Sequence, residues 1–183
     1  MRKTLTVLAA VLLAAPAFAA PLKLQPASPQ PSSLSPGLAV KYAEASVRKL
    51  SDAARVVGSA KPGKPLAGLD YWDTKEGEET LTAGRAMAVV AVIEGYVRFD
   101  APGVYNIDFL SNDGLRMTIG GQQVALHDGV HGCTESKAVQ ADVPQAGWYK
   151  LEGLYFQRKG TACLHMRAGM GAPDWMPNAA FGH

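Results

Sequence analysis

The sequence predicts an all-β protein, an antiparallel β-sandwich with little helix. Apolar and polar residues alternate with period two from residue 86 onward, as expected for half-buried strands. Turns containing Gly or Pro separate these runs every eight to twelve residues or so, a spacing typical of sandwiches and barrels. The 183 residues are 48% hydrophobic and 19% charged, which fits one globular domain and argues against overall disorder.

The first 19 residues have the pattern of a secretory signal. A positive start, Met1-Arg2-Lys3, precedes an apolar run over residues 5–15, and Ala17-Phe18-Ala19 fits the small-x-small cleavage rule. A membrane anchor is the alternative, but the run is shorter than the ~20 residues a span needs. We therefore predict cleavage after Ala19 and an exported protein, periplasmic or secreted, without a transmembrane segment once the signal is removed.

Residues 20–36 are rich in proline and serine and bury little by composition. We expect an extended tether here, and a folded domain over residues 37–183. The chain has 18 basic and 16 acidic residues, and Arg2 and Lys3 lie in the predicted signal. The near balance argues against a nucleic-acid partner bound through a broad basic surface.

Within the domain, residues 40–57 have apolar residues at helical spacing, and a strand followed by irregular chain competes with that helix. Later strands are expected from the alternation, with turns at residues 101–103, 111–114, 120–121, 145–147 and 159–160.

The phrase from Gly95 to Gly121, with its Pro102-Gly103-Val104-Tyr105 hairpin and Ser111-Asn112-Asp113-Gly114 turn, resembles the core of the protective-antigen-fourteen domain family. The segments 145–151 and 156–164 resemble two later strands of that family, and 37–42 resembles its opening strand. The resemblance implies a β-sandwich and favours a strand over residues 38–44. It also implies an extracellular domain of a kind that often binds carbohydrate.

In the sugar-binding members of that family, an Asp-Asp pair joined by a cis peptide holds a calcium ion that coordinates sugar hydroxyls. Asn112-Asp113 occupies the matching position here, with a neutral amide in place of the first carboxylate. The resemblance therefore implies calcium as the cofactor at Asn112 and Asp113, with one charge fewer. A plain hairpin turn is the alternative, since Asn and Asp tolerate positive φ.

The segment His127-Asp128-Gly129-Val130-His131 adds polar side chains close to that turn in the expected sandwich, and we include His127 and Asp128 in the predicted ligand site. The histidines, with Cys133, could instead hold zinc or copper, although Asp128-Gly129 breaks any helix that would align them. A solvated loop is the simplest reading.

Two cysteines, Cys133 and Cys163, allow one disulfide, which an oxidising compartment would favour. Aromatic residues could include a platform for sugar rings, although most aromatics in a sandwich are packed in the core. The set considered is Tyr71, Trp72, Tyr96, Trp148, Tyr155 and Trp175, with Trp148 expected to face the core.

The sequence lacks the common nucleophile-elbow, phosphate-loop and zinc-protease motifs, so we predict no enzyme. The expected function is an exported binding module that takes glycans through loops at one end of the sandwich, with calcium as a possible aid. The alternative is a structural or protein-interaction domain of the cell envelope, with an envelope protein as partner and no sugar site. We expect a monomer.

Overall fold

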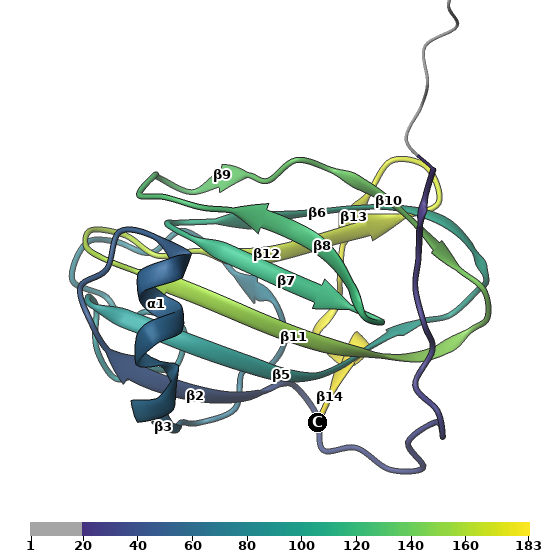
Figure 1. The fold of residues 1–183 in the computed structure, drawn as a ribbon, viewed down its shortest axis with the longest axis horizontal. Helices are drawn as coiled ribbons and strands as arrows, with labels where there is room; N and C mark the ends of the chain where they lie inside the picture. Colours follow the sequence, from purple (N-terminus) through teal and green to yellow (C-terminus); the bar gives the residue numbers. More distant parts are fainter. Residues whose placement is uncertain (1–19) are drawn as a thin grey trace, which may run out of the picture.

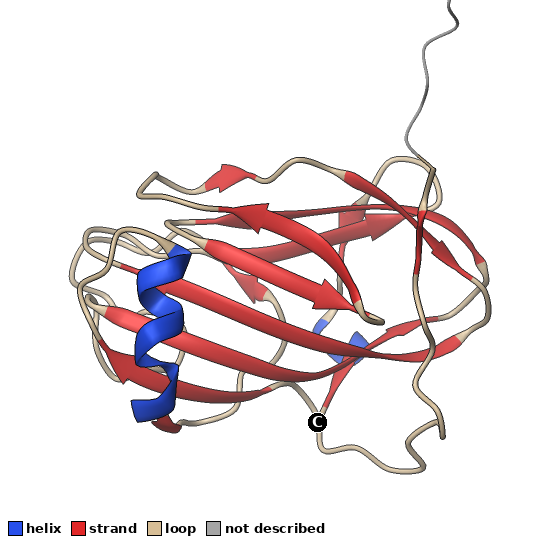
Figure 2. Ribbon diagram, viewed as in Figure 1, coloured by secondary structure: helices blue, strands red, loops and turns tan. Residues whose placement is uncertain are grey.

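Two β-sheets face each other across an apolar core in the computed structural model, which describes residues 20–183 (Figure 1 and Figure 2). The predicted signal peptide, residues 1–19, lies outside the described residues. The predicted all-β sandwich is confirmed.

The first sheet, sheet A, follows the order β1, β10, β6, β12 and β13. These strands are Leu22–Lys23, Val139–Val143, Gly103–Ser111, Leu164–Gly169 and Asp174–Trp175. Two short strands pair beside this path: β4 (Asp70–Tyr71) with β12, and β9 (Thr134–Glu135) with β6. Every pairing in sheet A is antiparallel except that of β1 with β10, which is parallel.

The second sheet, sheet B, follows the order β3, β2, β5, β11, β7 and β8, with β14 paired to β5. These strands are Lys61–Pro62, Ala39–Glu44, Val89–Phe99, Gly147–Gln157, Leu115–Ile119, Gln122–His127 and Phe181–Gly182. The long pair β5–β11 forms the middle of this sheet, in register from Gly147 opposite Phe99 to Gln157 opposite Val89.

Alternation along the strands builds the core between the sheets. On β12, Leu164, Met166 and Ala168 belong to the main apolar cluster, which leaves His165 and Arg167 on the outer face of sheet A. At the start of β11 the side chain that enters the core is Tyr149, so the expectation that its neighbour Trp148 faces the core is wrong. Trp148 instead lies on the outer face of sheet B, with the Arg98 guanidinium 5.8 Å from its ring centroid.

The segment 40–57 contains both elements that the sequence left open. It forms β2, as the family resemblance favours, and then α1 (Leu50–Val56), which continues as the 3-10 turn η1 (Val57–Ser59). Leu50 and Ala53 of α1 pack with Leu154 and Phe156 against the outer face of sheet B. A second 3-10 turn, η2 (Asn178–Ala180), precedes β14. No helix within residues 20–183 has the length and apolarity required to traverse a membrane.

The proline-rich residues 20–36 are not a free tether, so this expectation is corrected. Leu22 and Lys23 pair with β10, and Leu24 is 2% exposed in the core. Further along, the Gln30 side chain bonds both backbone groups of Trp148, and Ser35 exchanges two backbone hydrogen bonds with His183. The segment is extended, but it runs along the sandwich and is part of it (Figure 1). The overlooked signal is Leu22-Lys23-Leu24, a short apolar alternation among the prolines.

Candidate functional site

The turn between β6 and β7 contains Asn112 and Asp113, the residues predicted to hold calcium. Asp113 is 1% exposed and has a φ of 62°. One carboxylate oxygen accepts the backbone N–H of His131 at 3.0 Å, and the other accepts that of Arg158 at 2.7 Å. The Asn112 side chain donates to Thr161 Oγ1 at 2.9 Å. The turn therefore joins two loops that are distant in the sequence.

Two of these contacts use the carboxylate oxygens of Asp113, which a calcium ion at this turn would need. Calcium takes six to eight oxygen ligands in most proteins. Here both Asp113 oxygens are occupied by amides, and the Asn112–Asp113 peptide bond is trans. Burial raises the pKa of the Asp113 carboxyl above its ordinary value, and the two backbone hydrogen bonds only partly oppose this. The arrangement does not fit a calcium site, and calcium binding at Asn112 and Asp113 stays a prediction without support from the geometry.

His127 and Asp128 lie near this turn but do not converge with it on an open space. Asp128 Oδ1 accepts the backbone N–H of Leu50 at 2.7 Å, so it caps the first turn of α1 from a distant loop. The His127 ring stacks on that of His131, with centroids 3.9 Å apart, and its Nδ1 lies 3.4 Å from Ser111 Oγ. Burial and the neighbouring His131 lower the pKa of His127. The predicted ligand residues are close in space, yet their contacts are those of a structural junction.

The predicted disulfide between Cys133 and Cys163 is confirmed, with Cα atoms 5.9 Å apart. It joins the two loops that Asp113 also holds together. Closing a 30-residue separation contributes about 3–4 kcal/mol in the chain-entropy model. Within residues 20–183, Asp73, Cys133 and Cys163 form the single group of three potential metal ligands. Because its two sulfurs are bonded to each other, this group does not offer thiolates to a metal.

A second candidate site, with exposed aromatic and charged side chains, lies on the outer face of sheet A. We call it the aromatic face, and it consists of Asp70, Trp72, Asp108, Glu135, His165, Arg167 and Trp175. The strand register brings these residues together: His165 lies opposite Asp70 on β4, and Arg167 lies opposite Asp108 on β6 and Trp175 on β13. Trp72 follows β4 directly, two residues after Asp70, and so takes the same outward side.

Two tryptophans on this face are exposed, Trp72 by 60% and Trp175 by 38%. Their ring centroids lie 5.0 Å apart at an interplanar angle of 62°. Beneath them His165 is fully buried, 4.3 Å from the Trp72 ring and 5.1 Å from the Trp175 ring. Its Nδ1 lies 3.3 Å from Asp70 Oδ1 but outside hydrogen-bond geometry, and its Nε2 has no hydrogen-bond partner within residues 20–183.

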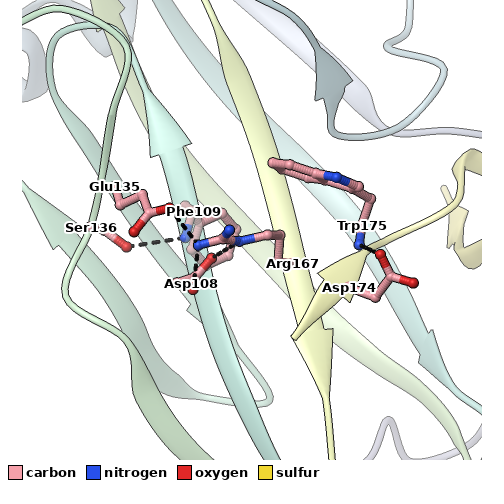
Figure 3. Close-up of polar contacts among 7 residues, drawn as sticks. All are labelled: Asp108, Phe109, Glu135, Ser136, Arg167, Asp174 and Trp175. Carbon is pink, nitrogen blue, oxygen red and sulfur yellow. Dashed lines mark hydrogen bonds and ion pairs between the residues drawn. The ribbon is translucent and has the colours of Figure 1, made fainter. Parts of the chain in front are cut away.

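Arg167 is held rigidly beside Trp175 (Figure 3). Its Nε and Nη2 donate to the two carboxylate oxygens of Asp108 at 2.7 and 2.9 Å, and Nη2 also donates to Glu135 at 2.8 Å. The hydrogen bond to Asp108 is the main cause of a raised Arg167 pKa. The guanidinium carbon lies 5.3 Å from the Trp175 ring centroid. A bidentate pair of this kind fixes the orientation of both groups.

Two further bonds in Figure 3 order the strands around Arg167. Ser136 Oγ accepts the backbone N–H of Phe109 at 3.1 Å, which keeps the segment after β9 against β6. Asp174 Oδ1 accepts the backbone N–H of Trp175 at 2.8 Å at the start of β13. Strands β6, β9 and β12 thus position Arg167, whereas Trp72 lies in the loop after β4.

We expect the protein to lose stability on acidification from pH 7.5 to 5.5, in part through His165. Burial lowers the pKa of His165 below the ordinary value of 6.5, and Asp70 only partly opposes this. As the pH falls below that ordinary value, the unfolded chain binds protons that the folded chain does not, so the free energy of unfolding decreases. His127, whose pKa is also lowered, acts in the same direction.

Thermal melting of wild type and His165→Phe at both pH values measures this effect. The variant keeps an aromatic ring under the tryptophans but does not titrate, so its melting temperature should fall less. Equal falls in the two proteins would contradict a neutral buried His165.

A groove of about 400 Å³ lies on the outer face of sheet B, beside α1. Its polar lining consists of Glu94, Arg116, Thr118 and Glu152, and it contains no aromatic side chain. The carboxylates of Glu94 and Glu152 stand on directly paired positions and are balanced by Lys41 and Lys150. Without an aromatic platform, this groove is a poorer site for a sugar ring than the aromatic face.

A comparison with models of known protein families identifies the family of this chain. The family model described as the PA14 domain matches residues 35–180. The chain belongs to the PA14 domain family. A search of curated protein sequences finds no match to this PA14 domain.

Several solved structures share the PA14 fold of this chain. The PA14 domain of the MpAFP antifreeze protein matches with a TM-score of 0.66 at 17% identity, covering 83% of this chain and 92% of that one. The PA14 sugar-binding domain from an RTX adhesin matches with a TM-score of 0.63 at 16% identity, covering 81% and 98%. The Epithelial Adhesin 9 A domain from Candida glabrata, in complex with Galβ1-3GlcNAc, matches with a TM-score of 0.64 at 11% identity, covering 89% and 95%. At these identities the likeness shows the fold alone.

The aromatic face of this PA14 domain was not singled out from the sequence, although Trp72 and Trp175 were considered for a platform. A usable signal was present in β6 and β12. Asp108 stands between core residues Ile107 and Phe109, and Arg167 stands between core residues Met166 and Ala168. Such opposite charges on outward positions of two strands indicate a cross-strand pair.

Proposed function

We propose that this PA14 domain is an exported, non-catalytic module that binds carbohydrate through the aromatic face. The observation that carries the proposal is the exposed pair Trp72 and Trp175 beside the fixed guanidinium of Arg167. Aromatic rings suit the apolar C–H face of a pyranose, while a small number of fixed polar groups orient its hydroxyls.

The relatives support this class of function. An RTX adhesin domain of the same fold is described as sugar-binding, and the Candida glabrata adhesin domain was solved with Galβ1-3GlcNAc. Export is supported by the signal-like residues 1–19 and by the disulfide. A non-catalytic role agrees with the absence of common enzyme motifs from the sequence and with the binding domains among the relatives.

Binding is proposed to need no metal ion, because both carboxylate oxygens of Asp113 accept backbone hydrogen bonds within the domain. A glycan array probed with the purified protein, once with calcium and once with chelator, tests the proposal. We expect the same glycans to be bound under both conditions.

Two results would contradict the proposal in different ways. Glycan binding in calcium but not in chelator would instead favour a binding site at Asn112 and Asp113. Binding of no glycan under either condition, with an envelope protein recovered by co-purification, would favour the structural or protein-interaction alternative.

A further inference from the structure

We infer that the aromatic face accepts uncharged and amine-bearing pyranose glycans and rejects glycans that carry carboxylates. This inference rests on the proposed function and specifies the class of ligand for the same site. It follows from the charges on the face and from the hydrogen-bonding atoms that remain free there.

The face carries three carboxylates, Asp70, Asp108 and Glu135, against the single guanidinium of Arg167. The fifth titratable side chain, His165, is fully buried with an unpartnered Nε2, an environment that favours its neutral form. The formal charge of the face is therefore negative. A negative surface repels an anionic sugar and leaves a neutral one unaffected.

Arg167 does not counteract this repulsion. Proteins commonly bind a carboxylate through two parallel N–H donors on one edge of a guanidinium. That edge of Arg167, formed by Nε and Nη2, is already occupied by both oxygens of Asp108. Asp108 is 5% exposed, so a uronate would have to displace a nearly buried partner.

The free atoms of the network suit hydroxyl groups instead. Within residues 20–183, Arg167 Nη1 makes no hydrogen bond, and Glu135 uses only Oε1, which accepts from Nη2. A hydroxyl can accept from Nη1 and donate to the remaining oxygen of Glu135, because it has both a proton and lone pairs. A carboxylate has no proton for Glu135, whereas an ammonium group has three.

Three matched tetrasaccharides test this selectivity. They share one linkage and one ring stereochemistry, chosen from the strongest array response, and differ in carrying neutral sugars, amino sugars or uronates. In calorimetric titrations with chelator present, the affinity for the neutral ligand should not depend on the salt concentration. The affinity for the amino-sugar ligand should increase at low salt. The uronate should bind at least about tenfold more weakly than the neutral ligand, as expected for like charges brought together.

Glu135→Gln provides the charge-altered site, since it removes one negative charge, keeps the size of the side chain and still offers one oxygen to Arg167 Nη2. This variant should bind the amino-sugar ligand more weakly, and the uronate ligand more tightly, than the wild type does. Glu94→Gln on the opposite sheet should change neither affinity. If the uronate ligand binds with an affinity equal to or higher than that of the neutral ligand, and Trp72→Ala abolishes this binding, the proposed selectivity is wrong. The assignment of the binding site to the aromatic face would still hold. Failure of all three ligands to bind would overturn the proposed function and this inference with it.

Discussion

Replacing Trp72 by alanine should weaken glycan binding by about tenfold or more, since stacking on one exposed aromatic ring is worth about 1–3 kcal/mol where it has been measured for nucleobases. The Trp72 side chain is 60% exposed, so its loss should change the melting temperature little. Trp175→Ala should have a comparable effect, because it removes the second ring and the aromatic contact of Arg167. Isothermal titration against the best glycan from the array measures both.

Two variants make the test specific. Leu126→Ala removes a side chain of similar exposure, 58%, from β8 of sheet B, and it should bind as wild type does. Trp72→Phe keeps a ring and should recover part of the lost affinity. Unchanged affinity in a well-folded Trp72→Ala protein would show that the aromatic face is not the binding site.

The second large effect concerns stability rather than binding. Asp113→Ala should lower the free energy of unfolding by about 3 kcal/mol, because it leaves two part-buried backbone amides without acceptors. Alanine also tolerates the positive φ at this position less well than aspartate does. For a domain of this size, such a loss corresponds to a fall in melting temperature of about 6–12 °C.

Neighbouring substitutions distinguish this account from general sensitivity of the turn. Asp113→Asn keeps one acceptor and the local backbone preference, so it should cost about half as much. Asp128→Ala removes an exposed cap from α1 and should cost only about 1 kcal/mol. If Asp113 instead served mainly to hold calcium, wild type would melt higher in calcium than in chelator, and Asp113→Ala would match the chelator value.

The long strands were predictable because each has a local pattern in the sequence. Alternation and glycine-bearing turns predict strands within residues 89–99 and 147–157, whereas their pairing at the centre of sheet B is seen only in the structure. The disulfide followed from the presence of two cysteines and from the predicted export to an oxidising compartment. The turn residues Asn112 and Asp113 were found, but their role depends on loop atoms of His131 and Arg158 that no local pattern reveals.

The aromatic face was harder to predict because strands distant in the sequence build it. Trp72 follows β4 and Trp175 ends β13, and these two short strands pair one after the other with the edge of β12 that β6 does not occupy. Only the register of those strands shows that both rings lie over His165. From composition alone, tryptophans in a sandwich are expected in the core, and here the tertiary arrangement places all three on outer faces.

The three tryptophans of the chain provide the most direct measurement of glycan binding at the aromatic face. Each indole N–H gives its own signal in an ¹⁵N-labelled protein, and Trp148 on the outer face of sheet B serves as an internal control. On titration with a neutral glycan in the presence of chelator, the signals of Trp72 and Trp175 should shift together while that of Trp148 stays in place. A glycan that binds with no change at Trp72 and Trp175 would contradict the account.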